Sequence, residues 1–152
     1  MAQTAERDTA ELMAAADALR PTVLRLAREL RSEARGEGVS PQQVALLVSI
    51  KYSPGVTAGE LAARERVSAA AMSKQVAHLE RDGFVARTPS AEDRRCVGLA
   101  LTQHGQRTLR RVRSRRTAWL VTRLRGLDPS DLAAIEAAAE PLSRLLHQGE
   151  GC

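Results

Sequence analysis

Aromatic residues are scarce in this chain of 152 residues: Phe, Trp and Tyr together make up 2% of it. The core must therefore rest on Leu, Val and Ala, and a sequence rich in Ala and Leu favours helices. The length suits one compact domain, or a small domain with an oligomerisation element. We expect a mainly α-helical fold of the α+β class.

Long apolar runs are also missing. No stretch approaches the ~20 apolar residues that a membrane-spanning helix needs. The first residues, Met1 to Thr9, include acidic side chains and lack the apolar region of a signal peptide. We therefore expect a soluble, cytoplasmic protein that makes no contact with a membrane.

Cysteine and histidine are too few for a disulfide framework or a metal site. Cys96 and Cys152 lie far apart, and the histidines, His78, His104 and His147, fall on three separate predicted helices. The chain also lacks a Gly-x-Ser-x-Gly elbow and a Gly-rich phosphate loop. We expect no metal, no cofactor and no enzymatic activity.

Positive charge comes almost entirely from arginine, because Lys51 and Lys74 are the only lysines and the net charge is +5. An excess of this kind suits an anionic partner such as nucleic acid. Six of the arginines should open a long helix and point all round it, mostly solvated or paired with acids of the first and last helices: Arg107, Arg110, Arg111, Arg113, Arg115 and Arg116.

Capping motifs mark the starts of the inner helices. Ser40-Pro41-Gln42-Gln43 and Thr57-Ala58-Gly59-Glu60 are capping boxes. Ser68 caps the next helix, which Asp82-Gly83 should end. The side chains expected to point inward are Val44, Leu47 and Val48 of the first of these helices and Met72, Val76 and Leu79 of the third.

The two outer helices carry apolar stripes. In the first helix the apolar positions alternate by steps of four and three, as in a coiled-coil seam: Leu12, Ala16, Leu19, Val23, Leu26 and Leu30. Pro21 should either kink this helix or let it restart. The last helix begins at Asp128-Pro129-Ser130-Asp131, and Pro141 should bend or shorten it.

The stretch from Thr57 to Gly105 reads as helix, tight turn, helix, strand, polar loop, strand and a new helix start. The strands are expected at residues 84–87 and 97–101, with the loop at 88–95 between them. This order is typical of a helix-turn-helix followed by a β-wing. We therefore predict a winged helix-turn-helix over residues 40–102.

The second helix of this motif suits a DNA major groove. Its first residues are small, so its backbone can approach the bases and its N-terminal amides can approach phosphate. Serine and glutamine can read base edges, while a lysine holds a phosphate. A solvated surface face explains this helix equally well when it is taken alone. The predicted DNA contacts here are Ser68, Ala70, Ser73, Lys74 and Gln75.

The wing loop ends in Asp93-Arg94-Arg95. Arginine suits a narrow, A·T-rich minor groove, where the negative potential is strongest. Asp93 has the wrong charge for DNA, so it should brace an arginine or cap the loop. The alternative is an ordinary surface turn whose ion pair contributes at most ~1 kcal/mol.

Two segments resemble the MarR family of bacterial transcriptional regulators. Residues 93–105 are similar to the family's wing signature, Asp-x-Arg followed by Leu-Thr-x-x-Gly, and residues 79–87 to its Leu-Glu-x-x-Gly-hydrophobic-hydrophobic-x-Arg segment. The resemblance implies that Arg95 is the wing-tip arginine, that Asp93 orients it and that Arg94 occupies a variable position between them.

The resemblance also implies an assembly and a function. Residues 8–36 and 103–148 should form a helical dimerisation region, and the dimer should repress transcription from a pseudo-palindromic operator with half-sites ~10 base pairs apart. An architectural or partner-docking winged-helix protein, without effector or specific operator, is the alternative. The residues expected at the dimer contact are Leu12, Leu19, Leu26, Leu132, Ile135 and Leu142.

Two modes of regulation follow from the resemblance. Members commonly respond to small phenolic or lipophilic ligands, yet Tyr52 and Trp119 are the only large aromatics near the right elements, and Trp119 is more typical of a core. Some members sense peroxide through a cysteine of the first helix, which this chain lacks. Cys96 lies beside two arginines that favour its thiolate, although a strand cysteine is usually a small hydrophobe. Cys152 is expected to be inert.

Overall fold

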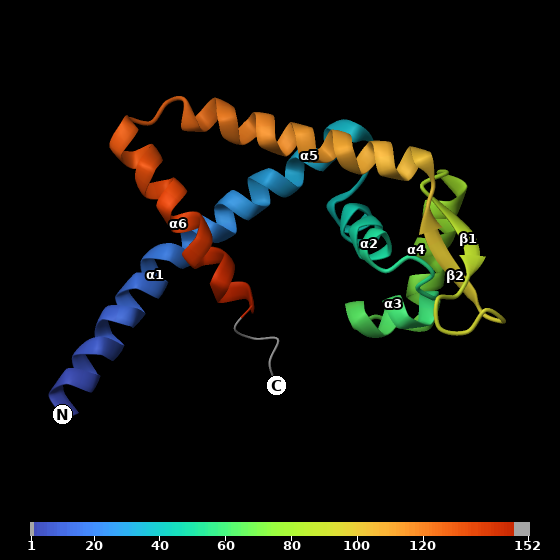
Figure 1. Ribbon diagram of the computed structural model, residues 1–152, viewed down its shortest axis with the longest axis horizontal. Helices are drawn as coiled ribbons and strands as arrows, with labels where there is room; N and C mark the ends of the chain where they lie inside the picture. Colours follow the sequence, from blue (N-terminus) through green and yellow to red (C-terminus); the bar gives the residue numbers. More distant parts are fainter. Residues whose placement is uncertain (1, 148–152) are drawn as a thin grey trace. The chain divides into compact units, whose positions relative to one another are not determined.

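The computed structural model describes residues 2–147, with side chains for residues 8–146. It divides into two compact units, one up to Arg116 and one from Thr117 onward. The expected mainly helical architecture with a small antiparallel sheet is confirmed (Figure 1). Its elements are α1 (Ala2–Ser32), the 3-10 helix η1 (Glu33–Glu37), α2 (Pro41–Tyr52), α3 (Ala58–Glu65), α4 (Ala69–Arg81), β1 (Val85–Pro89), β2 (Val97–Leu101), α5 (Gln103–Leu124) and α6 (Pro129–His147).

The inner helices begin where the capping motifs predict. The Ser40 hydroxyl accepts a hydrogen bond from the Gln43 amide at 3.1 Å, and the Gln43 side chain accepts one from the Ser40 amide at 2.8 Å. Thr57 and Glu60 form the same reciprocal pair at 3.2 and 2.6 Å. These bonds satisfy amides that the first turn of a helix otherwise leaves without a partner, so the predicted starts of α2 and α3 are confirmed.

The two outer helices differ from expectation at their prolines. Helix α1 is continuous across Pro21, so the predicted restart there is wrong. Helix α6 continues through Pro141 to His147, so this proline does not shorten it. Each proline removes one intrahelical hydrogen bond, but the flanking residues are largely Ala, Leu and Arg, which are strong helix formers. Two expectations concern residues outside the described part of the chain: the end of the dimerisation region at residue 148, and the inertness of Cys152.

The core of the first unit lies between the inner helices and the wing. The predicted inward face of α4 is confirmed, but Val48 of α2 is 37% exposed and was wrongly expected inside. The buried face of α2 is centred on Leu47 and Ile50, and Val48 falls one helical step to its flank. The buried apolar side chains of α2, α3, α4, the wing and α5 include Val44, Leu46, Leu47, Ile50, Leu61, Met72, Val76, Leu79, Phe84, Val85, Leu99 and Val112.

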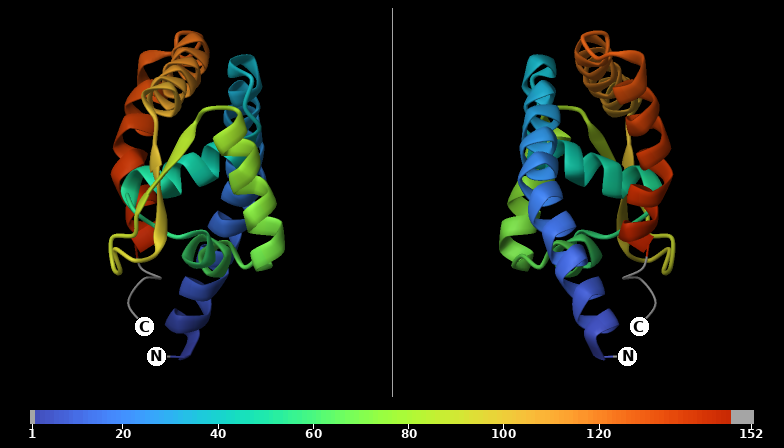
Figure 2. Two further views of the ribbon diagram at one scale, coloured as in Figure 1. Left: turned by 90° about the vertical axis from the view of Figure 1, so that its right-hand side faces the viewer. Right: turned by 90° about the vertical axis from the view of Figure 1, so that its left-hand side faces the viewer.

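The sheet is a hairpin in which Val85 pairs with Leu101 and Pro89 with Val97. Strand β1 thus runs two residues further into the loop than predicted. The segment between α2 and α3 adds a single bridge from Val56 to Leu99 on the other edge of β2. Figure 2 shows the wing loop, α3 and the start of α4 at one end of this unit. The elements expected to meet DNA therefore share one end.

Candidate nucleic-acid interface

The turn between α3 and α4 is short and well connected. Arg66 ends α3 in a left-handed conformation, with φ 53°, and the Val67 amide donates a hydrogen bond to the Ala62 carbonyl at 3.0 Å. Ser68 then caps α4 by accepting a hydrogen bond from the Ala71 amide at 3.1 Å. This arrangement is a helix-turn-helix.

Helix α4 presents most of the predicted contact residues to solvent. Burial of its apolar face fixes the rotation of the helix, and Ser68, Ala70, Ser73 and Lys74 are exposed on the other side. Gln75 is half-buried. The hydroxyl of Ser68 is engaged in the helix cap, which leaves the methyl groups of the first turn and the side chains of the second turn as the accessible chemistry.

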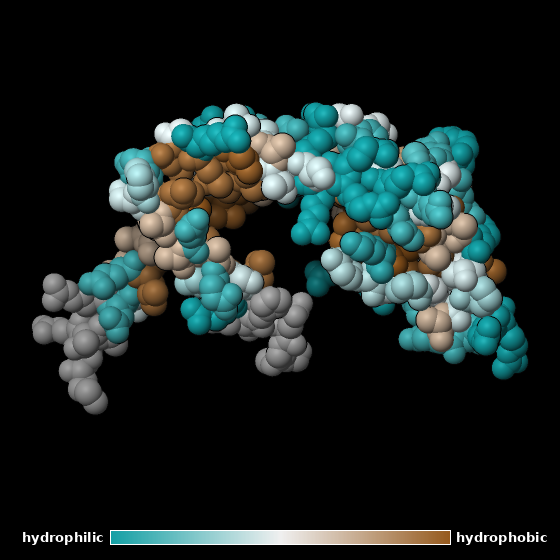
Figure 3. All heavy atoms as spheres, turned by 45° about the horizontal axis from the view of Figure 1, so that its top comes forward, coloured by the Kyte–Doolittle hydropathy of each residue, from teal (hydrophilic) through white to brown (hydrophobic). Residues whose placement is uncertain are grey.

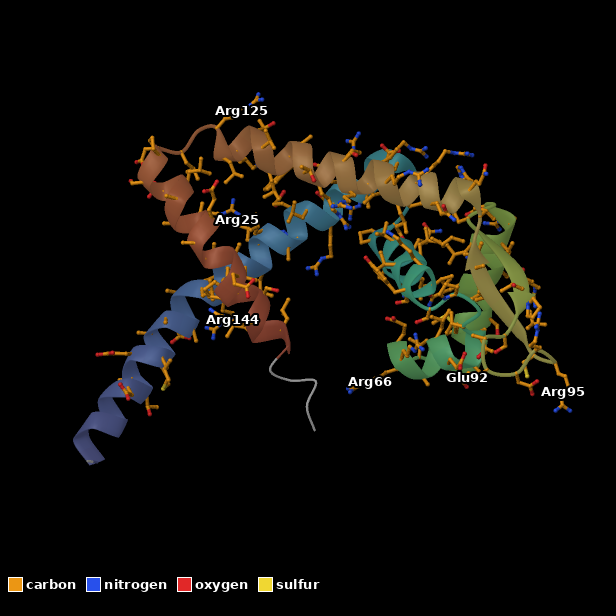
Figure 4. All side chains as sticks on the ribbon, viewed as in Figure 1. Arg25, Arg66, Glu92, Arg95, Arg125 and Arg144 are labelled. Carbon is orange, nitrogen blue, oxygen red and sulfur yellow. The ribbon has the colours of Figure 1, made fainter. Side chains whose placement is uncertain are left out.

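The wing tip is organised by Asp93. Its carboxylate accepts a hydrogen bond from the backbone amide of Arg95 at 2.9 Å, and its carbonyl accepts one from the Cys96 amide at 2.8 Å. The same carboxylate oxygen lies 3.5 Å from Nε of Arg95, whose side chain is 94% exposed. Asp93 therefore contacts both the backbone and the side chain of Arg95, which projects from the loop (Figure 4). Arg94 is also exposed.

Thr102 joins the base of the wing to α5. Its hydroxyl donates to the Gly83 carbonyl at 2.6 Å and accepts from the Gly105 amide at 3.0 Å. Gly105 packs so closely on the carbonyl oxygen of Phe84 that a Cβ would overlap it. The Leu-Thr-x-x-Gly pattern thus has a structural cause: it fixes the end of α4, the start of β1 and the start of α5 at one point.

An ion pair that the sequence did not suggest holds α4 against the wing. Arg87 of β1 donates two hydrogen bonds to the Glu80 carboxylate, from Nε at 2.8 Å and from an Nη at 3.1 Å. Two parallel bonds give such a pair a defined geometry. The sequence signal for this pair is that Glu80 and Arg87 carry opposite charges on either side of the Asp82-Gly83 turn. The contact orients the hairpin relative to α4.

The arginines of α5 lie away from this interface. Arg115 pairs with Glu33 at 3.5 Å, inside the first helical region expected to span residues 8–36, and Arg111 pairs with Glu37 at 2.6 Å, one residue beyond it. Both acids lie in η1. The first turn of α5 lies at the end of the unit opposite the wing loop (Figure 2).

The part of the chain that the structure describes contains no cluster of three or more His, Cys, Asp or Glu that could hold a metal ion. None of the helices seen there combines the length and apolarity needed to cross a membrane. Cys96 is exposed in the loop before β2, so the expectation of a small hydrophobe packed in a strand is wrong.

Comparison with known proteins agrees with this geometry. The model of the MarR family matches residues 39–97. The chain is 34% identical over 126 residues to an uncharacterized helix-turn-helix-type transcriptional regulator of Mycobacterium leprae, covering 83% of this chain and 88% of the relative. It is 32% identical over 77 residues to the transcriptional repressor MdtR of Bacillus subtilis, covering 51% of this chain and 50% of MdtR.

A solved Pseudomonas aeruginosa protein, described as a transcriptional regulator, has the same fold. It superposes with a TM-score of 0.75 at 34% identity, over 92% of this chain and 97% of that protein. These proteins are regulators rather than enzymes. The chain belongs to the MarR family of winged helix-turn-helix transcriptional regulators.

Proposed function

We propose that this protein is a homodimeric repressor that binds a pseudo-palindromic operator through α4 and the wing. The observation that carries the proposal is the common position of the exposed α4 face and the exposed Arg95 at one end of the first unit. Helix α4 enters the major groove, Lys74 holds a phosphate, and Arg94 and Arg95 reach the adjacent minor groove. The name of the related MdtR supports repression rather than activation.

Exposed apolar side chains on both outer helices support a homodimer. A single chain leaves them facing water, which monomeric proteins rarely do over a large contiguous patch, and a second copy would cover them across a two-fold axis. Figure 3 shows hydrophobic residues gathered near α6 and the end of α5, whereas hydrophilic residues cover the first half of α5. The exposed residues are Leu12, Met13, Leu19, Val23, Leu24 and Leu26 of α1 and Ile135, Leu142, Leu145 and Leu146 of α6.

We further propose that a small effector binds in a cleft of about 510 Å³ in the first unit and thereby causes the protein to release the DNA. Ile50, Leu101 and Leu109 are apolar residues of its lining, and no carboxylate is among the residues that line it. Neither Tyr52 nor Trp119 lines it, so it offers no aromatic platform. The remaining lining residues are Lys51, Pro54, Ala100, Gln106, Arg110 and Arg113.

This lining suits an anion with an apolar body, such as an aromatic carboxylate. The apolar surface removes the ring from water, while three cations balance the charge. The cleft joins the end of α2 to β2 and the start of α5. An occupant would therefore favour conformers in which the wing base and α5 are displaced, which shifts the population toward dimers that do not fit the operator.

A binding titration tests the DNA-binding proposal. The intact protein is titrated at two salt concentrations against the DNA upstream of its own gene and against a scrambled duplex of equal length. A specific repressor retains a preference of ~10³-fold or more for its operator. The architectural alternative predicts that salt weakens both complexes equally and that no preference exists.

The effector is tested on the same complex. Benzoate should dissociate wild-type protein from the operator, and Arg110→Gln should bind the operator normally but resist benzoate. Equal release of both proteins would exclude the cleft as the effector site, and release of neither would exclude aromatic carboxylates.

A further inference from the structure

Arg66 has an unusual backbone conformation. It lies in the left-handed region, at φ 53° and ψ 43°, and it is the only residue other than glycine with a positive φ in the part of the chain that the structure describes. The other described positions of this kind are Gly38, Gly55 and Gly83.

A β-carbon is disfavoured in this conformation, and glycine or asparagine usually occupies it at the end of a helix. Arginine offers no local hydrogen bond that would compensate. Strained positions of this kind persist where the surroundings impose them, and they concentrate at functional sites. The side chain of Arg66, rather than its backbone, is therefore the feature that needs an explanation.

The neighbouring side chains are tied to α2, whereas that of Arg66 is not. Arg64 donates a hydrogen bond to the Ser53 hydroxyl at 2.8 Å, and Glu65 accepts one from Ser49 at 3.5 Å. Arg66 is exposed, and among residues 8–146 no carboxylate lies within ion-pair distance of it. Its charge is thus available to a partner outside the chain.

The position of Arg66 identifies that partner. It precedes the N-cap of α4 by two residues, and Figure 4 shows Arg66 and Arg95 along the same lower edge of the first unit, at its two sides. A duplex that receives α4 in its major groove and Arg95 in the adjacent minor groove carries a sugar-phosphate strand along the other side of α4.

We propose that Arg66 binds a DNA phosphate on the side of α4 opposite the wing, and that the left-handed turn aims its guanidinium at that strand. Arg66 and Arg95 would then hold the duplex from both sides of the recognition helix. The contact is independent of base sequence, because phosphate contacts position the protein and base contacts give specificity. This inference rests on the DNA binding proposed above.

Three substitutions separate charge from backbone strain. Arg66→Gln removes the charge and keeps the strain, Arg66→Lys keeps the charge, and Arg66→Gly removes both. A duplex titration over a range of salt concentrations gives the slope of log affinity against log salt. Each lost phosphate contact reduces the magnitude of that slope by ~0.9. If affinities at 1 M salt are equal, the variant therefore binds ~8-fold more weakly than wild type at 0.1 M salt. We expect this loss per chain for Arg66→Gln and Arg66→Gly, and only a small change for Arg66→Lys.

Thermal unfolding provides the second readout. Arg66→Gly should raise the unfolding midpoint by ~2–4 °C relative to Arg66→Gln. Arg125→Gln is the matched control: it removes an exposed arginine from the turn between α5 and α6 and should leave the salt slope unchanged. The proposal is overturned if Arg66→Gln binds with the wild-type slope, or if Arg125→Gln lowers it equally.

These results are distinguishable from failure of the proposed function. The salt slope can be measured on a scrambled duplex, whereas the repressor proposal depends on preference for the operator over that duplex. If the protein shows no preference for the operator but Arg66→Gln still reduces the salt slope, the phosphate contact is supported and only the repressor proposal fails.

Discussion

Gly98 of β2 lies directly against the backbone of Gly55, in the loop between α2 and α3. A Cβ on Gly98 would overlap the carbonyl group of Gly55. The Gly55 amide donates to the Leu99 carbonyl at 2.8 Å, and its carbonyl accepts from the Ala91 amide at 3.1 Å. Gly55 itself has φ +84°, which favours glycine. This glycine pair therefore fixes the wing on the loop that leads into the helix-turn-helix.

Gly98→Ala should destabilise the protein, because the added methyl group must push two backbones apart. We expect a loss of about 1–3 kcal/mol in the free energy of unfolding, together with weaker operator binding as the wing shifts. Chemical denaturation measures the first effect and a DNA titration the second.

The control for this variant is Gly59→Ala, in the exposed part of α3, where a Cβ would meet nothing closer than 3.9 Å. Alanine favours a helix over glycine by about 0.5–1 kcal/mol, so this variant should be slightly more stable than wild type. A Gly98→Ala protein as stable as Gly59→Ala would contradict the close approach described here.

Arg95→Ala should weaken operator binding without affecting the fold. Arg95 contacts only the Asp93 carboxylate and is otherwise exposed, so its loss leaves no buried group unpaired. Removal of a groove-reading arginine typically costs about 1–3 kcal/mol in binding. Arg125→Ala removes the same charge from the turn before α6 and should bind normally. If wild type, Arg95→Ala and Arg125→Ala bind the operator equally well, the wing arginine does not contribute to DNA binding.

Glu60 predicts a pH dependence of stability. Hydrogen bonds from the backbone amide and side chain of Thr57 hold the pKa of its carboxyl below its usual value of 4.5. Because the folded-state pKa is lowered, the ionised group stabilises the folded protein above about pH 4.5, and this contribution disappears as the pH falls through the lowered pKa.

Glu60→Gln keeps an acceptor for the capping box but cannot ionise. Its stability relative to wild type should therefore be lower at pH 7 than at a pH below the lowered pKa of Glu60, where the wild-type carboxyl is neutral as well. Urea denaturation at the two pH values measures the difference. A pH-independent difference would mean that the carboxylate charge adds nothing to the cap.

The features predicted correctly from the sequence depend on residues close together in the chain. Capping boxes join residues three positions apart, as with Ser40 and Gln43, and the buried face of α4 follows from helical period alone. Within the wing signature, the Thr102 hydroxyl likewise accepts a hydrogen bond from the Gly105 amide three residues on. Contacts of this kind lie within one turn of the chain and depend little on the rest of the fold.

The features that the sequence did not reveal depend on contacts distant in the chain. Gly55 and Gly98 read as separate loop and strand glycines until the fold brings their backbones together. Glu80 and Arg87 read as two surface charges, and nothing local distinguishes Arg66 from the other arginines. Pro21 illustrates the converse error, because a local rule predicted an interruption that the flanking helix formers override.

The exposed apolar stripe of α6 is one of the surfaces proposed to hold the dimer together. Leu142→Glu places a charge on the exposed apolar stripe of α6, where Leu142 is 38% exposed. Burial of an unpaired carboxylate at an interface costs several kcal/mol, whereas its exposure costs a monomer little. The variant should therefore sediment as a monomer at concentrations where wild type is a dimer, with its helical circular dichroism retained. Ser143→Glu adds the same charge one helical step away from the stripe and should remain dimeric. If Leu142→Glu also stays dimeric at micromolar concentration, the stripe of α6 is not the surface that holds two chains together.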